Sequence, residues 1–261
     1  MTDEDIRRNV LSQIGQLHKQ DYSVVLIHGG GPEINKLLEL AKVQSEFIGG
    51  QRKTTEETMY YVQLALRGEV NGSLVRLLNH MGIPAVGISG KDGGMVTAIK
   101  RYHITDEQNG NRIKNDIGYV GDVDSINPTL IDALSDTGFL PVIAPIALGT
   151  DGHDYNINAD IFAGAVAAAI GADMYVSLTN VNGLYENYPD EHSRIEETDA
   201  KALREFMVKS ADGGMLPKLE SIIQALENGV REAHIINGTA ENALLKQISE
   251  NIISGTKIRS N

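Results

Sequence analysis

The sequence predicts an α/β fold, a three-layer αβα sandwich whose central sheet is mainly parallel and covered by helices on both faces. The first observation is a short apolar run, residues 24–27, which leads through His28-Gly-Gly-Gly31 into an amphipathic stretch that begins at Pro32. The second is that this order recurs, with apolar runs at 84–88, 139–144, 174–178 and 233–236. Short strands that are apolar throughout are typical of parallel sheets buried between two helix layers.

Helical periodicity accounts for most of the segments between these runs. Residues 6–17 carry apolar side chains at helical spacing, and Thr2 or Asp3 would cap that helix. Helices are also predicted at 128–135, at the alanine-rich 159–170 and at about 216–228. The polar segment 101–116 contains Asn109-Gly110, a common turn pair, and is predicted as a hairpin or surface excursion beside the sheet.

Composition excludes several classes of protein. Acidic residues outnumber basic ones by 35 to 23, and the net charge of −12 argues against a nucleic-acid or anionic-membrane partner. The chain has no cysteine, and its seven histidines lack ligand spacing, so neither a disulfide framework nor a metal site is expected. The acidic N-terminus lacks the basic and apolar regions of a signal peptide. The longest weakly polar run, 162–172, is too short to span a bilayer. We therefore expect a cytoplasmic protein.

Two glycine-rich loops are the strongest candidates for an anion site. Gly29, Gly30 and Gly31 lie between a strand and a helix, where backbone amides can approach a phosphate at the positive end of the helix dipole. The alternative for these glycines is a tight turn that needs positive φ. The second loop, 89–94, contains Gly90 and suits phosphate binding or ordinary turn chemistry equally. Because the chain has neither a P-loop pattern nor a Rossmann fingerprint, the residues alone indicate an α/β protein with anion-binding loops.

Eight motifs follow one another along the chain. They are His28-Gly-Gly-Gly-Pro32, Gly50-Gln-Arg-Lys-Thr54, Gly68-Glu-Val-Asn71, Ser89-Gly-Lys-Asp-Gly93, Gly118-Tyr-Val-Gly-Asp-Val123, Asn156-Ile-Asn-Ala-Asp160, Leu178-Thr-Asn-Val-Asn-Gly183 and Gly213-Gly-Met-Leu-Pro-Lys218. Together they resemble the amino-acid kinase family, and within it the kinases of N-acetylglutamate, over about residues 24–258. The resemblance implies the amino-acid kinase fold in a single domain over 1–261. Its N-lobe, about 1–150, would bind the substrate, and its C-lobe, about 151–261, would bind ATP.

The resemblance also implies a reaction, the ATP-dependent phosphorylation of the γ-carboxylate of N-acetyl-L-glutamate in arginine biosynthesis. Mg²⁺ would arrive bound to the ATP phosphates, so no dedicated carboxylate cage is expected. A carboxylate nucleophile is ionised at pH 7 and needs no general base. Catalysis would then depend on alignment and on neutralising charge at the moving phosphoryl group.

By the same resemblance, Lys218 is the catalytic cation and Asp160 orients catalytic lysines. The alternatives are a surface lysine on a helix and a plain helix N-cap, respectively. Arg52 would clamp a substrate carboxylate with its bidentate guanidinium, and its alternative is a solvated surface charge. The other implied substrate ligands are Gly29, Gly30, Asn156 and Asn158, and the implied phosphate and nucleotide ligands are Gly31, Gly90, Thr179, Asn180, Gly183, Gly213 and Met215.

The chain departs from the family pattern at its start. Family members begin with a strand that ends in K-x-G-G-S and supplies a second catalytic lysine, and this motif occurs nowhere in the 261 residues. Without it the sheet lacks its first strand and the transition state lacks one cation, a loss of at least about 10²–10³ in rate. We expect that the natural gene continues in frame upstream of Met1 and encodes this strand. A stop codon directly before Met1 would contradict that expectation. Asn180 also stands where the family usually has aspartate.

Two other functions stay open at this point. One is a sibling kinase that acts on carrier-bound aminoadipate or glutamate. The other is a catalytically impaired ligand-binding subunit, which the absent lysine suggests. The expected partners are N-acetyl-L-glutamate and ATP, and the family resemblance suggests a homodimer or a higher homo-oligomer.

Overall fold

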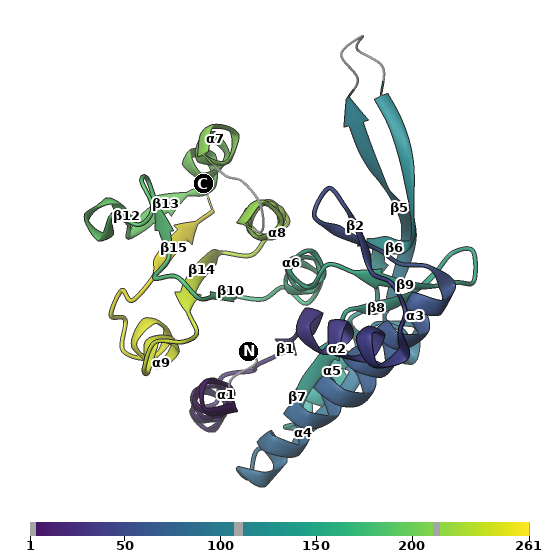
Figure 1. The fold of residues 1–261 in the computed structure, drawn as a ribbon. Coiled ribbons are helices and arrows are strands. Elements are labelled where there is room, and N and C mark those ends of the chain that lie inside the picture. The colour runs from purple at the N-terminus through teal and green to yellow at the C-terminus, as the bar shows by residue number, and fades with distance from the viewer. Residues whose placement is uncertain (1–3, 107–111, 211–214, 261) are drawn as a thin grey trace.

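A computed structural model describes residues 4–106, 112–210 and 215–260 (Figure 1). The helices are α1 Glu4–Lys19, α2 Gly31–Ala41, α3 Glu56–Gln63, α4 Asn71–His80, α5 Thr129–Asp136, α6 Ala159–Ala169, α7 Ala200–Ser210, α8 Met215–Glu227 and α9 Ala243–Ile248. A π-helical segment, Leu64–Val70, joins α3 to α4, and short 3-10 turns cover Asp92–Gly94 and Glu191–Ser193. The strands are β1 Leu26–Ile27, β2 Glu46–Ile48, β3 Gln51–Lys53, β4 Ala85–Ser89, β5 Val96–Asp106, β6 Arg112–Ile126, β7 Leu140–Ala144, β8 Ile146–Gly149, β9 Asp154–Ile157, β10 Met174–Thr179, β11 Leu184–Tyr185, β12 Arg194–Ile195, β13 Glu197–Asp199, β14 Glu232–Asn237 and β15 Thr256–Arg259.

The strands of the αβα core divide between two sheets. The first is parallel throughout and has the order β1-β7-β4. The second has the order β10-β14-β15-β13, in which β10 and β14 run parallel and β15 runs antiparallel to β14. The prediction of a mainly parallel sheet is confirmed for β1, β7 and β4 and for the pair β10 and β14. The division into two sheets and the antiparallel β15 are not evident from the sequence.

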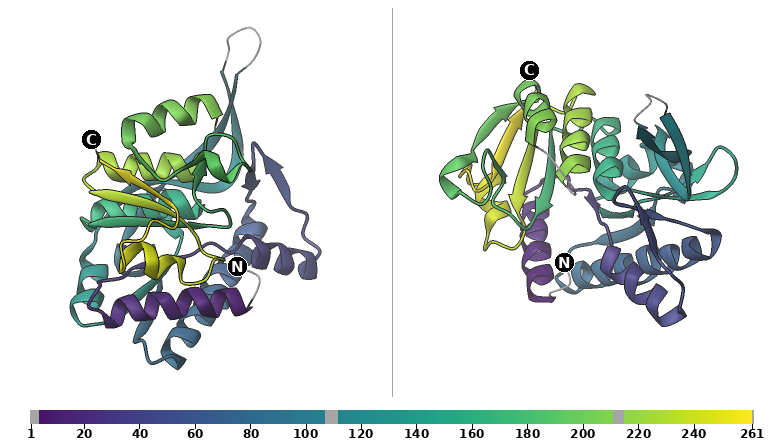
Figure 2. Two further views of the ribbon diagram at one scale, coloured as in Figure 1. Left: turned by 90° about the vertical axis from the view of Figure 1, so that its left-hand side faces the viewer. Right: turned by 45° about the horizontal axis from the view of Figure 1, so that its top comes forward.

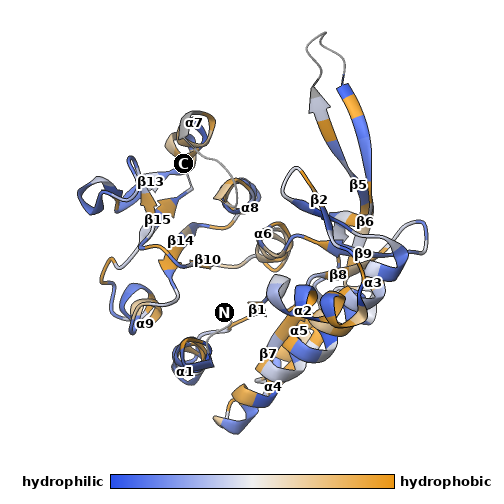
Figure 3. Ribbon diagram, in the orientation of Figure 1, coloured by the Kyte–Doolittle hydropathy of each residue, from blue (hydrophilic) through white to orange (hydrophobic). Residues whose placement is uncertain are grey.

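Helices cover both faces of the second sheet because its strands are apolar on both. On β14, Ala233 and Ile235 belong to a buried cluster with side chains of α7 and α8. Ile236 instead belongs to a cluster with side chains of α1 and α9. Figure 1 shows these helix pairs on opposite sides of the sheet, and Figure 3 shows apolar residues along β14 and β15 between them. This arrangement is the predicted three-layer sandwich.

The cluster on the α1 side also connects the two sheets. It includes Leu140 and Val142 of β7 together with Ile236 of β14, and side chains of α4 complete it. All of these side chains are buried. The segments 1–150 and 151–261 therefore share one hydrophobic core.

The predicted segments lie close to the observed elements. α1 spans the predicted helix 6–17, and its expected cap, Thr2 or Asp3, lies outside the described residues. The predicted hairpin at 101–116 is part of the longer β5–β6 pair, whose turn residues Asn109-Gly110 also lie outside the described residues. Figures 1 and 2 show this hairpin projecting from the body of the molecule. None of the helices over 4–106, 112–210 and 215–260 is long and apolar enough to cross a membrane.

Four strands form a small closed barrel, β5-β6-β9-β8, that the sequence does not predict. β9 ends at Ile157, and α6 begins at Ala159, so the barrel directly precedes the start of α6. The N-terminus of α6 is therefore held by a buried strand, which matters for the site below.

Candidate active site

Lys218 and Asp160 meet beside β10. Lys218 lies in the first turn of α8, and its Nζ donates hydrogen bonds to Asp160 Oδ1 at 2.7 Å and to Ser177 Oγ at 2.7 Å. The Lys218 side chain is only 12% exposed, so it is not a solvated surface lysine. A cation this buried needs an anionic partner, which Asp160 supplies. The structure thus brings together the two residues that the resemblance implies are catalytic, while their roles stay a prediction.

The position of Asp160 follows from the way α6 begins. Asn158 is the N-cap, and its Oδ1 accepts the backbone N–H groups of Asp160 at 2.9 Å and Ile161 at 3.2 Å. The interpretation of Asp160 as the cap is therefore wrong. Asp160 stands in the first turn, where the helix dipole favours a carboxylate, and its side chain is left to face Lys218. Within the described part of the chain, Asn158 Nδ2 makes no hydrogen bond and stays available to a ligand.

The first glycine loop lies against the N-terminus of α6. A Cβ placed on Gly29 would stand 3.7 Å from the Cβ of Ala159, so the starts of α2 and α6 are neighbours. α2 begins at Gly31, with Gly30 as a cap that offers no side-chain hydrogen bond. The uncapped start of α2 therefore lies beside the start of α6, whose amides at Asp160 and Ile161 are capped by Asn158, and the positive ends of both helix dipoles favour an anion near Asp160.

The three glycines of this loop do not owe their identity to backbone conformation. None of the three has φ in the left-handed region that favours glycine, since Gly30 is near-extended at 173°, so the tight-turn interpretation is wrong. Gly30 has a packing reason, since a Cβ there would lie 2.7 Å from the side chain of Leu66. A Cβ on Gly31 would meet nothing within 4 Å. The open space at Gly31 is consistent with a ligand that approaches the backbone.

Packing explains Gly90 in the second loop. Its N–H donates to the carbonyl of Ala144 at 3.4 Å, and a Cβ there would lie 2.7 Å from the carbonyl oxygen of Ile146. The glycine is needed because the backbone of β8 comes this close. The phosphate contact of Gly90 stays a prediction, but its amide is already engaged within the protein.

A buried pair behind the first loop is missed by the sequence analysis. Asn71 Nδ2 donates to Nε2 of His28 at 3.1 Å and to the carbonyl of Val142 at 2.9 Å, while Arg67 donates to Asn71 Oδ1 at 3.0 Å. His28 Nδ1 then carries the proton and donates to the carbonyl of Gly29 at 2.9 Å. Burial lowers the pKa of His28, so the ring is neutral at pH 7, as this network requires. The available signal was that His28 and Asn71 both belong to motifs of the family resemblance, although nothing in the sequence predicts that they pair.

Arg52 lies on β3, in the β2–β3 hairpin, and is half-buried. Its Nη2 donates to Asn35 Oδ1 at 2.6 Å, its Nη1 donates to Ser45, and the guanidinium lies 4.7 Å from the ring centroid of Phe47. Asn35 belongs to α2, in the turn that follows the glycine loop, so Arg52 faces the same helix. Desolvation lowers the pKa of Arg52, and no carboxylate lies against it within the described ranges. A substrate carboxylate would supply the missing anion.

For the remaining predicted ligands the structure gives a position in the fold, and their contacts with substrate or nucleotide stay predictions. They are Asn156 on β9, Thr179 at the end of β10, the exposed Asn180 after it, and Met215 at the start of α8. Gly183 has φ 114°, and a Cβ there would lie 2.6 Å from Thr256 Oγ1. The fold therefore requires glycine at this position whether or not it binds the nucleotide. Gly213 lies outside the described residues. In the part of the chain that the structure describes, no three His, Asp or Glu side chains gather as a metal site would require.

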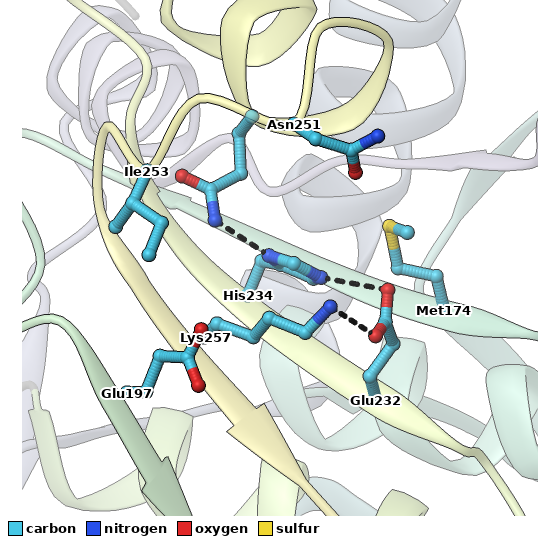
Figure 4. Close-up of a pocket in the computed structure, with 8 residues that line it drawn as sticks. Met174, Glu197, Glu232, His234, Asn251, Ile253 and Lys257 are labelled. Atoms are coloured by element: carbon cyan, nitrogen blue, oxygen red, sulfur yellow. Dashed lines mark hydrogen bonds and ion pairs between the residues drawn. The ribbon is translucent and has the colours of Figure 1, made fainter.

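A second polar cluster surrounds a cavity of about 180 Å³ at the amino ends of β10 and β14, away from Lys218 (Figure 4). His234 is 2% exposed, and its Nε2 donates to Glu232 at 3.2 Å while its Nδ1 accepts from Gln247 at 3.0 Å. Lys257 of β15 pairs with the other oxygen of Glu232 at 2.5 Å. Glu197 of the neighbouring strand β13 is the register partner of Lys257. Desolvation lowers the pKa of His234 although Glu232 opposes the shift.

The buried His234 makes folding stability depend on pH. In the unfolded chain His234 binds a proton near pH 6.5, whereas in the folded protein it binds one only at lower pH. The stabilising contribution of the neutral ring is therefore fully present above about pH 6.5 and is lost as the pH falls below that value. We expect the free energy of unfolding, measured with urea at pH 7.5 and 5.5, to fall less in His234→Gln than in the parent. One proton contributes at most about 1.4 kcal/mol per pH unit. His153→Gln removes an exposed histidine and is the control; equal slopes in all three proteins would contradict the prediction.

Comparison with known proteins adds to this geometry. Residues 1–237 match the model of the amino acid kinase family. The chain is 41% identical, over 99% of its length and 83% of the relative, to the acetylglutamate kinase of Thermoanaerobacter sp. (strain X514). Among solved structures, it is similar to smu.665 of Streptococcus mutans UA159, with a TM-score of 0.76 at 28% identity over 100% of this chain and 94% of that one. It shares the fold of the N-acetylglutamate synthase of Neisseria gonorrhoeae, with a TM-score of 0.81 at 23% identity over 99% of this chain and 57% of that one.

Proposed function

Because the chain belongs to the amino acid kinase family, we propose that it transfers the γ-phosphoryl group of ATP to the side-chain carboxylate of N-acetyl-L-glutamate. The similarity to acetylglutamate kinases over nearly the whole chain supports this substrate. The products are ADP and the acyl phosphate N-acetylglutamyl 5-phosphate. ATP enters as its Mg²⁺ complex, so the metal belongs to the substrate.

The observation that carries the proposal is the buried Lys218–Asp160 pair beside two helix N-termini. During transfer, negative charge is spread over the equatorial oxygens of the phosphoryl group. The Lys218 ammonium and the uncapped amides at the start of α2 would stabilise that charge, and the dipole of α6 would add to their effect. The attacking carboxylate is already ionised at pH 7, so the protein need not supply a nucleophile or a general base.

Arg52 and the asparagines would align the acceptor. The half-buried guanidinium of Arg52 bonds only neutral oxygens in this structure, and a substrate carboxylate would replace Asn35 and Ser45 as its partner. Asn158 would donate its free amide to the substrate while its oxygen keeps α6 capped. Alignment of this kind contributes to rate by holding the reacting oxygen near the phosphorus.

The variant Gly31→Ala tests phosphate binding without a change in folding stability. A Cβ at this position meets no protein atom within 4 Å, and alanine favours a helix over glycine, so the variant should be as stable as the parent or more stable. The methyl group would nevertheless occupy the space proposed for phosphate, and we expect kcat/KM for MgATP to fall by about tenfold or more. Gly72→Ala on α4, where the space is also open, is the matched control and should leave the kinetics unchanged. Unchanged kinetics in Gly31→Ala would place the phosphate elsewhere.

Trapping the acyl phosphate with hydroxylamine tests the function directly. The 261-residue chain is incubated with MgATP and N-acetyl-L-glutamate, alone and in a second version with a K-x-G-G-S strand added at its N-terminus, and the hydroxamate is measured. Hydroxamate with free N-acetylglutamate supports the proposal. Hydroxamate only with a carrier-bound aminoadipate or glutamate would identify a sibling kinase. Tight binding of ATP or N-acetylglutamate without hydroxamate would indicate a ligand-binding subunit.

Several properties of the proposed enzyme follow from the family rather than from contacts in this structure. We propose a cytoplasmic homodimer or higher homo-oligomer that acts in arginine biosynthesis. We also propose that the first 150 residues mainly bind N-acetylglutamate and that residues 151–261 mainly bind the nucleotide. Light scattering on the purified chain measures the assembly state, and a monomer at micromolar concentration would contradict that part.

A further inference from the structure

We propose that Ser177 is a positioning residue that holds the Lys218 ammonium in one orientation for phosphoryl transfer, an inference that rests on the proposed function. Ser177 lies on β10, is 4% exposed and pairs in register with Ile235 of β14. Its hydroxyl accepts from Lys218 Nζ at 2.7 Å and donates to Asp160 Oδ1 at 3.4 Å. The serine, the lysine and the aspartate therefore form a closed hydrogen-bonded triangle.

The hydrogen bonds of the Lys218 ammonium show what the serine adds. An ammonium has three N–H donors. Two are engaged at 2.7 Å, by Asp160 and by Ser177, and among the described residues the third has only a 3.5 Å contact with the carbonyl of Leu178. The third donor is the one that can turn to a phosphoryl oxygen at little cost. With Asp160 alone, the ammonium could rotate and share its donors in several ways. Two fixed acceptors leave a single direction for the third donor, and such preorganisation matters for transition-state charge.

Ser177 is itself held in place. β10 is paired with β14 along six residues, from Met174 to Thr179, so the backbone at Ser177 is fixed by the sheet. Its hydroxyl has one proton, which goes to Asp160, and its lone pairs face Lys218. Ser177 stands between Val176 and Leu178, and a buried serine is an unusual choice for packing alone because a buried hydroxyl costs free energy unless it is hydrogen-bonded.

Tyr175 provides a matched control on the same strand. It lies two residues before Ser177, on the same face of β10, and is 6% exposed. Its hydroxyl contacts the backbone carbonyl of Asp160 at 3.3 Å and Ser221 Oγ at 3.2 Å, and neither Lys218 Nζ nor the Asp160 carboxylate. The Tyr175 hydroxyl also interacts with Ser177 and with the charge of Asp160, but it makes no hydrogen bond to the Lys218 ammonium. Tyr175→Phe therefore removes a neighbouring buried hydroxyl and leaves the hydrogen bonds of the ammonium in place.

Kinetics of Ser177→Ala and Tyr175→Phe give the first test. We expect Ser177→Ala to lower kcat by about tenfold, with the KM values for N-acetylglutamate and MgATP within about twofold of the parent. Tyr175→Phe should lose a similar amount of thermal stability and keep kcat within about twofold. A kcat of Ser177→Ala equal to that of the parent overturns the proposal, and so does an equal loss of kcat in Tyr175→Phe.

The NMR signal of the Lys218 ammonium gives a second test that needs no turnover. Its ¹H–¹⁵N resonance, assigned by its loss in Lys218→Arg, reports how fast the ammonium protons exchange with water. We expect exchange to quicken by about tenfold in Ser177→Ala and to stay unchanged in Tyr175→Phe. An unchanged signal in Ser177→Ala overturns the positioning role even if the enzyme is active. A chain without kinase activity on any acceptor would instead refute the proposed function, and this signal would still decide the role of Ser177.

Discussion

Replacing Lys218 with alanine should lower kcat by about 10²–10³, the loss seen when one donor to a developing anionic charge is removed. KM for N-acetylglutamate should change by less than about threefold, because the ammonium is held by Asp160 and Ser177 and is proposed to face the moving phosphoryl group rather than the acceptor. Steady-state ADP release, with hydroxamate formation as the second readout, measures both constants.

The control for Lys218→Ala is a lysine in a comparable ion pair outside the site. Lys100 Nζ lies 2.8 Å from Asp116 Oδ2 on the β5–β6 hairpin, and Lys100→Ala also leaves an aspartate without its lysine, although Asp116 is more exposed than Asp160. We expect this variant to keep the kcat of the parent. A Lys218→Ala protein that is folded and has unchanged kcat would show that the transition-state cation is a different residue.

Replacing Arg52 with alanine should raise KM for N-acetylglutamate by about 10- to 100-fold, since each hydrogen bond to a charged group contributes about 1.5–3 kcal/mol. Within the part of the chain that the structure describes, only Asn35, Ser45 and the ring of Phe47 compensate the half-buried charge of the guanidinium. It therefore gains more from an anionic ligand than a solvated arginine would. Initial rates over a range of N-acetylglutamate concentrations, at saturating MgATP, give the change in KM.

Arg204→Ala is the matched charge control for Arg52→Ala. Arg204 lies on α7, and its Nε donates to Glu227 of α8 at 3.0 Å on the exposed surface. Both variants remove one positive charge from a chain of net charge −12, so a general electrostatic effect on an anionic substrate would appear in both. If KM rises equally in the two variants, or is unchanged in Arg52→Ala, the substrate clamp is wrongly assigned.

The fold follows from the sequence where the periodicity is strong. The apolar runs at 84–88, 139–144, 174–178 and 233–236 lie on β4, β7, β10 and β14, and the helical pattern of 159–170 lies on α6. Two features of the fold, the antiparallel β15 and the small barrel, cannot be predicted from periodicity. β15 pairs antiparallel with β14 through contacts between distant residues, and the barrel closes through pairing of β5 with β8 and of β6 with β9. Strand pairing of this kind depends on which segments meet in space, and local spacing does not report it.

The candidate site is only partly readable from the sequence. The resemblance singles out Lys218, Asp160 and Arg52, and the structure places the first two 2.7 Å apart. It does not single out Ser177, although this serine contacts both. Nor does it predict that Asn158 caps α6, because capping depends on where the helix begins, a boundary that patterns locate only to within a few residues.

The amino-acid sequence is enough to predict the alternation of strands and helices, to exclude cysteine chemistry and to identify the family whose motifs run from His28 to Lys218. Which of those residues share a site depends on how the folded chain packs. Asp160 and Lys218 are 58 positions apart, and they meet because α6 and α8 pack together on one face of the sheet that contains β10 and β14. The tertiary structure also decided why Gly30 and Gly90 are glycines, since a Cβ at either would strike a distant part of the chain. The physical reason is the same in each case. Periodicity and composition record which side chains are buried, whereas the position of a charge or a hydroxyl depends on close packing between segments that are far apart in the chain.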